Sequence, residues 1–135
     1  MRKITLFLVV LFCLGLTGCS KDADVNVFIT EFESVTKEIV SKIDADPSEK
    51  GIDAAQKAFD GKKASLTAKW IAVKDAIGIQ VSADVKKKLE DSVTKSTDDL
   101  MAVTTKHAME LGADDGAMKK FETLIKDYQA TFEAK

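Results

Sequence analysis

The sequence predicts an all-α fold, an up-down-up-down antiparallel four-helix bundle that follows a cleaved signal peptide. Apolar residues recur every three or four positions along most of the chain, which is the period of a helix. The 135 residues include only one proline and seven glycines, too few for a turn-rich β fold. The segments between the periodic stretches are short, so consecutive helices are expected to be antiparallel neighbours.

The first two helices are predicted on either side of the only proline. The first helix is expected over residues 25–44, and Asp46 and Pro47 then end it and start the second, with Asp46 as N-cap. The second helix is expected to continue to a C-terminal cap at Gly78. Its apolar stripe stays in phase across Gly61, which favours one helix with Gly61 as the place for a bend.

The third and fourth helices have their own start and stop signals. Ser82 is expected to cap the third helix, Gly112 to end it, and Asp114 or Asp115 to open the fourth. The second and third helices, roughly 45 Å each, should form a long central hairpin projecting beyond the four-helix core. Ser96 interrupts the stripe of the third helix. The apolar stripe of the third helix is Val85, Leu89, Val93, Leu100, Val103 and His107. The stripe of the fourth helix is Met118, Phe121, Ile125, Tyr128 and Phe132.

The first 18 residues differ from the rest of the chain. Arg2 and Lys3 precede an apolar run of about eleven residues that ends at Leu16, and no acidic residue interrupts it. This is the order of a secretion signal, and the run is short for a membrane-spanning helix, which needs roughly 20 residues. The length therefore favours a cleaved signal over an uncleaved anchor helix.

The signal ends with Leu16-Thr17-Gly18-Cys19, which resembles the lipobox of bacterial lipoprotein precursors. The resemblance implies cleavage before Cys19 and attachment of a diacylglyceryl group, and often of an amide-linked acyl chain, which would anchor the body to membrane lipid. Ser20 follows the cysteine, and in enterobacterial lipoproteins an aspartate there favours the inner membrane. We therefore expect the periplasmic face of the outer membrane, or the cell surface in a host with one membrane. The expected domains are a signal peptide at 1–18, a lipidated tether at 19–24 and a helical bundle at 25–135.

The mature composition disfavours several classes of function. Cys13 leaves with the signal and Cys19 is consumed by the lipid, so no thiol remains for a disulfide, a metal or catalysis. Of the 20 basic residues only Arg2 and Lys3 lie in the signal, leaving 18 interspersed with 22 acidic residues, which disfavours nucleic acid. No phosphate loop, Ser/His/Asp set or metal-ligand cluster is present. The mature domain is predicted not to be an enzyme.

His107 and Met118 are the candidate cofactor ligands. His107 is the only histidine, and an antiparallel turn near Gly112 would bring it close to Met118. A histidine and a methionine facing each other in a bundle can ligate haem. A lone histidine near a helix end is more often hydrogen-bonded to a carboxylate or carbonyl, so no cofactor is expected.

Residues 22–33 partly match a calcium-binding loop. Asp22, Asp24, Asn26 and Glu33 fall where the loop needs oxygen ligands. Val27, however, occupies the position where the sharp turn needs glycine. The segment is therefore expected to be the tether and the first helical turn, and no metal site is predicted.

Two functions remain open for the mature domain. The leading hypothesis is a non-enzymatic binding module at the cell envelope, with an envelope protein as partner. The alternative is a carrier of a small ligand or cofactor, such as haem, in the bundle interior. Phe59 and Trp70 are expected in the core, although a projecting hairpin that exposed Phe59 would offer a partner surface.

Overall fold

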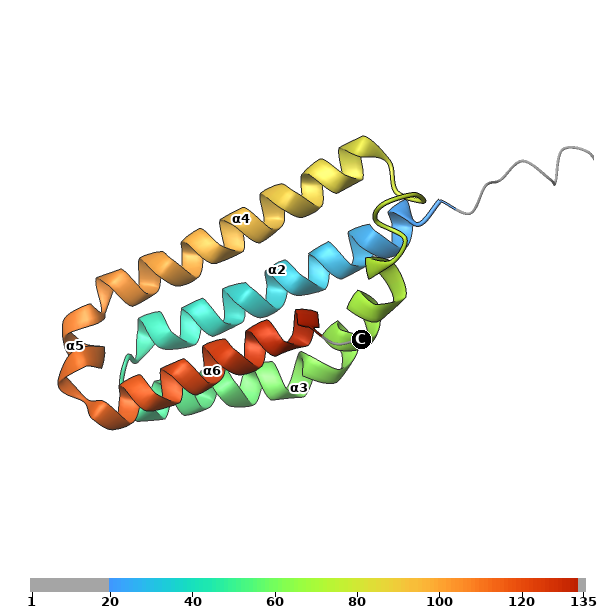
Figure 1. Ribbon diagram of the computed structural model, residues 1–135. Helices are drawn as coiled ribbons and strands as arrows, with labels where there is room; N and C mark the ends of the chain where they lie inside the picture. The colour runs from blue at the N-terminus through green and yellow to red at the C-terminus, as the bar shows by residue number, and fades with distance from the viewer. Residues whose placement is uncertain (1–19, 134–135) are drawn as a thin grey trace, which may run out of the picture.

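The computed structural model describes residues 20–133, which are almost entirely helical and contain no strand. The predicted all-α class is therefore confirmed for this part of the chain, whereas the signal peptide and Cys19 lie outside the described residues. Five helices pack against one another (Figure 1). They are α2 (Asp22–Ala45), α3 (Glu49–Lys74), α4 (Ala83–Lys106), α5 (Ala108–Ala113) and α6 (Asp115–Glu133).

Helix α2 begins at Asp22, so residues 22–24, predicted as tether, belong to the bundle. A contact distant in sequence explains the difference. The backbone N–H of Ser82 donates to the Asp22 carboxylate at 2.8 Å, and the N–H of Lys21 donates to the carbonyl of Gln80 at 2.9 Å. The hydrogen bond from Ser82 also lowers the pKa of the Asp22 carboxyl. The start of α2 is thereby fastened to the loop that precedes α4.

Helix α3 begins later and ends earlier than the local signals suggest. Its N-cap is Ser48 rather than Asp46, whose carboxylate instead accepts the Ser48 N–H at 3.1 Å. The helix continues without a break through Gly61, as the apolar stripe predicted. It ends at Lys74, before the predicted cap at Gly78, and a series of turns leads to α4.

The predicted third helix is interrupted at His107. Ser82 caps α4 as expected, with its Oγ accepting the N–H of Val85 at 3.4 Å, but the helix ends before His107 and α5 follows as a separate piece. The backbone of His107 is not helical, since its ψ is 19°, and its imidazole forms a hydrogen bond with Asp44 of α2. Asp114 then opens α6 as predicted, because its carboxylate accepts two backbone N–H groups at 3.0 Å each.

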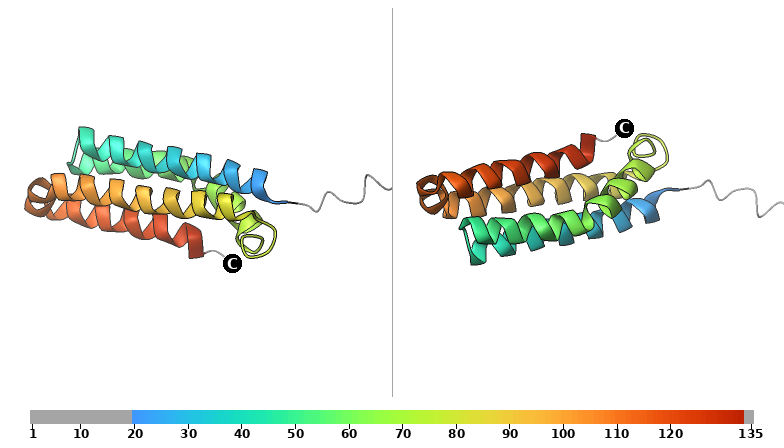
Figure 2. Two further views of the ribbon diagram at one scale, coloured as in Figure 1. Left: turned by 90° about the horizontal axis from the view of Figure 1, so that it is seen from above. Right: turned by 90° about the horizontal axis from the view of Figure 1, so that it is seen from below.

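The helices do not form the predicted central hairpin. Helix α2 packs against α3 and α4, and α3 packs against α6, but no Cα atom of α3 lies within 8 Å of one in α4. Residues 75–82 connect α3 to α4 in such a way that α4 packs against α2 instead. Helices α4 and α6 likewise have no Cα atoms within 8 Å of each other. Figure 1 shows them apart with α2 visible between them, and Figure 2 shows both on the same side of α2 and α3.

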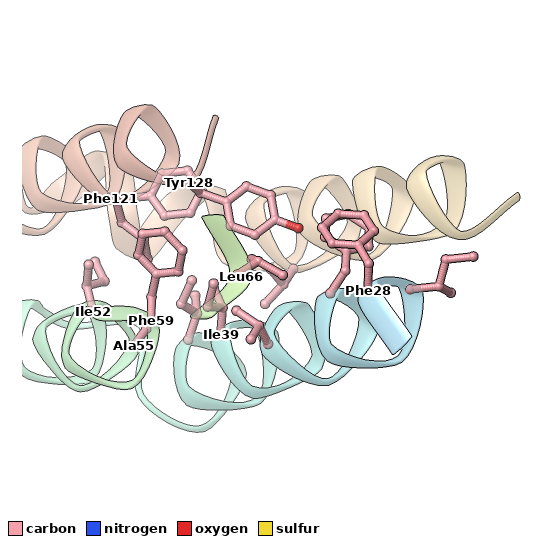
Figure 3. Close-up of a cluster of buried hydrophobic side chains, with 14 of the residues drawn as sticks. Phe28, Ile39, Ile52, Ala55, Phe59, Leu66, Phe121 and Tyr128 are labelled. Atoms are coloured by element: carbon pink, nitrogen blue, oxygen red, sulfur yellow. The ribbon is translucent and has the colours of Figure 1, made fainter. Parts of the chain in front are cut away.

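The hydrophobic core lies mainly between α2, α3 and α6 (Figure 3). Phe59 is completely buried, as predicted, so it does not offer an exposed partner surface at a hairpin tip. Helix α4 adds only Leu89 and Val103 to the buried apolar residues. The prediction that Val93 faces the core is wrong, because this side chain is 46% exposed while Ser92 and Ser96 are buried.

Two glycines of α3 should respond oppositely to alanine. A methyl group at Gly61 would meet nothing within 4 Å, so Gly61→Ala should raise the free energy of unfolding by about 0.5–1 kcal/mol, because glycine loses more freedom on folding. Gly51→Ala should lower it, since the methyl would overlap the backbone oxygen of Asp46. Urea unfolding of both variants tests this, and a loss of stability in Gly61→Ala would mean that the helix is not continuous there.

Candidate apolar binding groove

The open side of the bundle, between α4 and α6, contains a groove of about 690 Å³. It exists because α2 is the only long helix that α4 packs against, which leaves side chains of α2, α3 and α6 uncovered on this side. None of the residues that line the groove is charged, although 31% of the residues in the chain are. The groove is therefore a neutral, predominantly apolar surface on an otherwise highly charged protein.

Aromatic rings from three helices form one wall of the groove. Phe28 and Phe32 come from α2, Trp70 from α3, and Tyr128 and Phe132 from α6. Neighbouring ring centroids lie 5.4 Å apart between Phe28 and Trp70 and 5.5 Å apart between Tyr128 and Phe132. The indole N–H of Trp70 donates to the carbonyl of Phe132 at 2.9 Å. Such ring pairs add packing energy beyond their buried area, which stabilises this wall.

Helix α4 supplies the opposite wall. Leu89, Val93, Thr97 and Met101 are spaced four residues apart and all line the groove, and Met101 is 63% exposed. The Thr97 hydroxyl donates to the carbonyl of Val93 at 2.9 Å, so its proton is used within the helix. Thr97 and Met101 were missed because the predicted stripe passed through Leu100 and Val103. The four-residue spacing was the signal that could have found them.

Helix α6 contributes most of the stripe predicted for it. Phe121, Ile125, Tyr128 and Phe132 all line the groove. Phe121 and Tyr128 also reach the core, whereas Leu124, which was not on the predicted stripe, is completely buried. The prediction of an apolar face on this helix is confirmed, but part of that face lines the groove instead of packing in the core.

The polar atom of Tyr128 is turned to the core and bonded there. Its hydroxyl lies 2.6 Å from Oγ1 of Thr36, and Thr36 in turn donates to the carbonyl of Phe32 at 2.9 Å, so the tyrosine is the donor. Burial raises the pKa of Tyr128 to about 12. The phenol thus presents mainly its ring to the groove.

His107 and Met118, the candidate cofactor ligands, do not line the groove. The Nε2 atom of His107 lies 2.9 Å from the Asp44 carboxylate, which is the kind of partner expected for a lone histidine. Lys106 donates to the same carboxylate, and the hydrogen bonds from Lys106 and then His107 lower the pKa of Asp44. This cluster ties the end of α4 to the end of α2.

Residues 20–133 do not form a candidate metal site. They contain no group of three histidine, cysteine, aspartate or glutamate side chains arranged to hold a metal ion. The calcium-loop pattern of residues 22–33 lies within α2, so it is helix rather than loop. In the same part of the chain, no helix combines the length and apolar character needed to cross a bilayer.

No protein-family model matches the chain, and no curated protein or solved structure is significantly similar to it. The groove and the N-terminal motif are therefore the features that bear on its function.

Tyr128 should titrate far above its ordinary range. It is the only tyrosine in the chain, so phenolate absorbance in the native protein should show one transition at about 12 instead of 10.0. Because the folded state holds the proton more tightly, the contribution of Tyr128 to stability is complete below pH 10 and is lost as the pH rises toward 12. The urea-unfolded protein is the control. A native midpoint near 10 would show that the hydroxyl is not buried.

Proposed function

We propose that this protein is a lipid-anchored, non-enzymatic binding module of the cell envelope and that the groove between α4 and α6 is its binding surface. The observation that carries the proposal is the uncharged groove of about 690 Å³. Sites for small molecules are mostly apolar and measure about 300–1,000 Å³. Large exposed apolar patches on soluble domains mark binding surfaces. The groove also offers no pair of titratable groups for acid–base catalysis.

The anchor in this proposal is Cys19. Its support is the sequence Leu16-Thr17-Gly18-Cys19, and Ser20 favours the periplasmic face of the outer membrane. Because α2 begins at Asp22, the chain between Cys19 and the helix spans at most about 10 Å. Helix α2 begins and α6 ends at the same end of the bundle (Figure 1). An acylated Cys19 would hold that end against the membrane.

The proposal includes a more detailed architecture than the all-helical class. Helices α2, α3, α4 and α6 alternate in direction along the bundle (Figure 1), which supports an up-down-up-down arrangement of four helices. Helix α5 then serves as the link between α4 and α6. The bundle is closed on three sides and open on the side of the groove.

A small-ligand carrier is the second candidate function, and the size of the groove favours it. The ligand would lie in the open groove rather than in an enclosed interior. His107 and Met118 do not line this space, which leaves Met101 as the only sulfur ligand there. Haem added to the purified protein should therefore give no Soret band of a ligated haem, and such a band would revive the haem hypothesis.

Acylation of Cys19 can be tested directly. Intact mass analysis of membrane-extracted protein should show a chain that begins at Cys19 and carries acyl groups. Cys19→Ser behind a non-lipoprotein signal should carry no acyl groups and should not remain with the membrane, because the lipid on Cys19 is the proposed anchor. A full-length, unmodified chain in the membrane would contradict the anchor and the localisation.

Binding at the groove can be tested by crosslinking in intact cells. A photoreactive amino acid in place of Thr97, on the groove wall, should give discrete adducts. The same amino acid in place of Thr123 is a matched control, since Thr123 is exposed and bonded within its own helix in the same way but lies outside the groove. Identical adducts from both positions would exclude the groove as the binding surface.

A further inference from the structure

We propose that the groove holds one hydrocarbon chain of a bilayer lipid. This inference rests on the proposed function, because the anchor at Cys19 is what brings the groove to the bilayer. It adds the chemical class and the source of the ligand, which neither the groove volume nor the N-terminal motif specifies.

The chemistry of the lining favours an uncharged and mainly apolar ligand. No charged residue lines the groove. The Trp70 N–H, the Tyr128 hydroxyl and the Thr97 hydroxyl all donate to groups of the protein itself. A chain of methylene groups needs no polar partner, and each buried methylene contributes about 0.8 kcal/mol.

The length of the groove fits a complete acyl chain. Along α4 the lining extends from Leu89 to Thr105, which is about 24 Å at 1.5 Å per residue. The hydrocarbon core of a bilayer is about 30 Å thick, so the chains of one leaflet span about 15 Å. One acyl chain can therefore lie lengthwise in the groove.

One end of the groove lies close to the expected membrane surface. Phe28 is about 9 Å along α2 from Asp22, the first residue of the helix. Leu89 lies near the start of α4 and Phe132 near the end of α6, both at this end of the bundle (Figure 1). A lipid chain can enter here while its headgroup remains at the interface.

A polypeptide helix fits the same surface less well. Peptide grooves usually combine apolar pockets with charged residues that orient the peptide. The residues around this groove that could make polar contacts include Thr105 and Gln129, which are neutral. The lining thus provides apolar contact without any charge that would select a peptide sequence or direction.

Trp70, the only tryptophan, gives the groove a built-in reporter. The soluble body can be produced as Cys19→Ser behind a non-lipoprotein signal, because every side chain of the hydrophobic core lies within the bundle from Val25 to Tyr128. Stearic acid brominated at mid-chain should quench Trp70 fluorescence in a saturable manner, since bromine quenches on contact. Butyrate should not compete, whereas unlabelled stearate should.

Matched variants locate the binding. Met101→Glu and Val93→Glu place a carboxylate in the groove and should weaken binding of the brominated acid by about tenfold or more. Met109→Glu and Val27→Glu are the controls, because these residues are exposed but do not line the groove. All four positions are at least 46% exposed, so thermal unfolding should show that each variant remains folded.

The source of the chain is tested with the natural lipidated protein in nanodiscs of brominated phospholipid. Trp70 should be quenched there, and Met101→Glu should relieve the quenching. Quenching by the free acid but not by the bilayer would assign the groove to the acyl chains of Cys19 and overturn the proposal. The proposal would also be overturned if quenching were absent or non-saturable, or if the control variants bound the brominated acid as weakly as the groove variants. A dimer that is dissociated only by Met101→Glu and Val93→Glu would overturn it as well. None of these results affects the intact mass of the chain acylated at Cys19, so the anchor is tested separately.

Discussion

The weak core face of α4 is the constraint on which the rest of the structure depends. Two of its four buried residues are Ser92 and Ser96, whereas most buried residues of the other long helices are apolar. It supplies Leu89 and Val103 to the core, which is enough to pack against α2. Because attraction between helices grows with the apolar area that they bury together, the two serines weaken the packing of α4 on the core. The side between α4 and α6 remains open.

The aromatic cluster behind that opening belongs to the core and to the surface at the same time. Phe28 and Tyr128 are buried, whereas Trp70 and Phe132 are only half-buried, so the cluster continues from the interior to the groove wall. Its polar atoms are bonded to the protein, notably the Tyr128 hydroxyl to Thr36. What remains toward the groove is largely hydrocarbon. A surface of this kind is costly to leave in water, and covering it with an apolar ligand would recover that cost.

Features that depend on neighbours in the sequence were predictable. Ser82 and Asp114 cap their helices because each accepts an N–H group from the first turn that follows it, and the stripe across Gly61 indicated a continuous α3. Features that depend on distant partners were not. The early start of α2 needs the N–H of Ser82, 60 residues away, and the break at His107 accompanies a bond to Asp44, 63 residues away.

By itself, the sequence determined that residues 20–133 would be helical and which faces of the helices would be apolar, because a period of 3.6 residues is a local property. The tertiary structure alone decided what each apolar face meets. The stripes of α4 and α6 look partly into the groove, since α4 lies on α2 rather than on α3 or α6. Periodicity sets the direction of a side chain relative to its own helix axis, but the connections and the competing packing surfaces select the neighbouring helix.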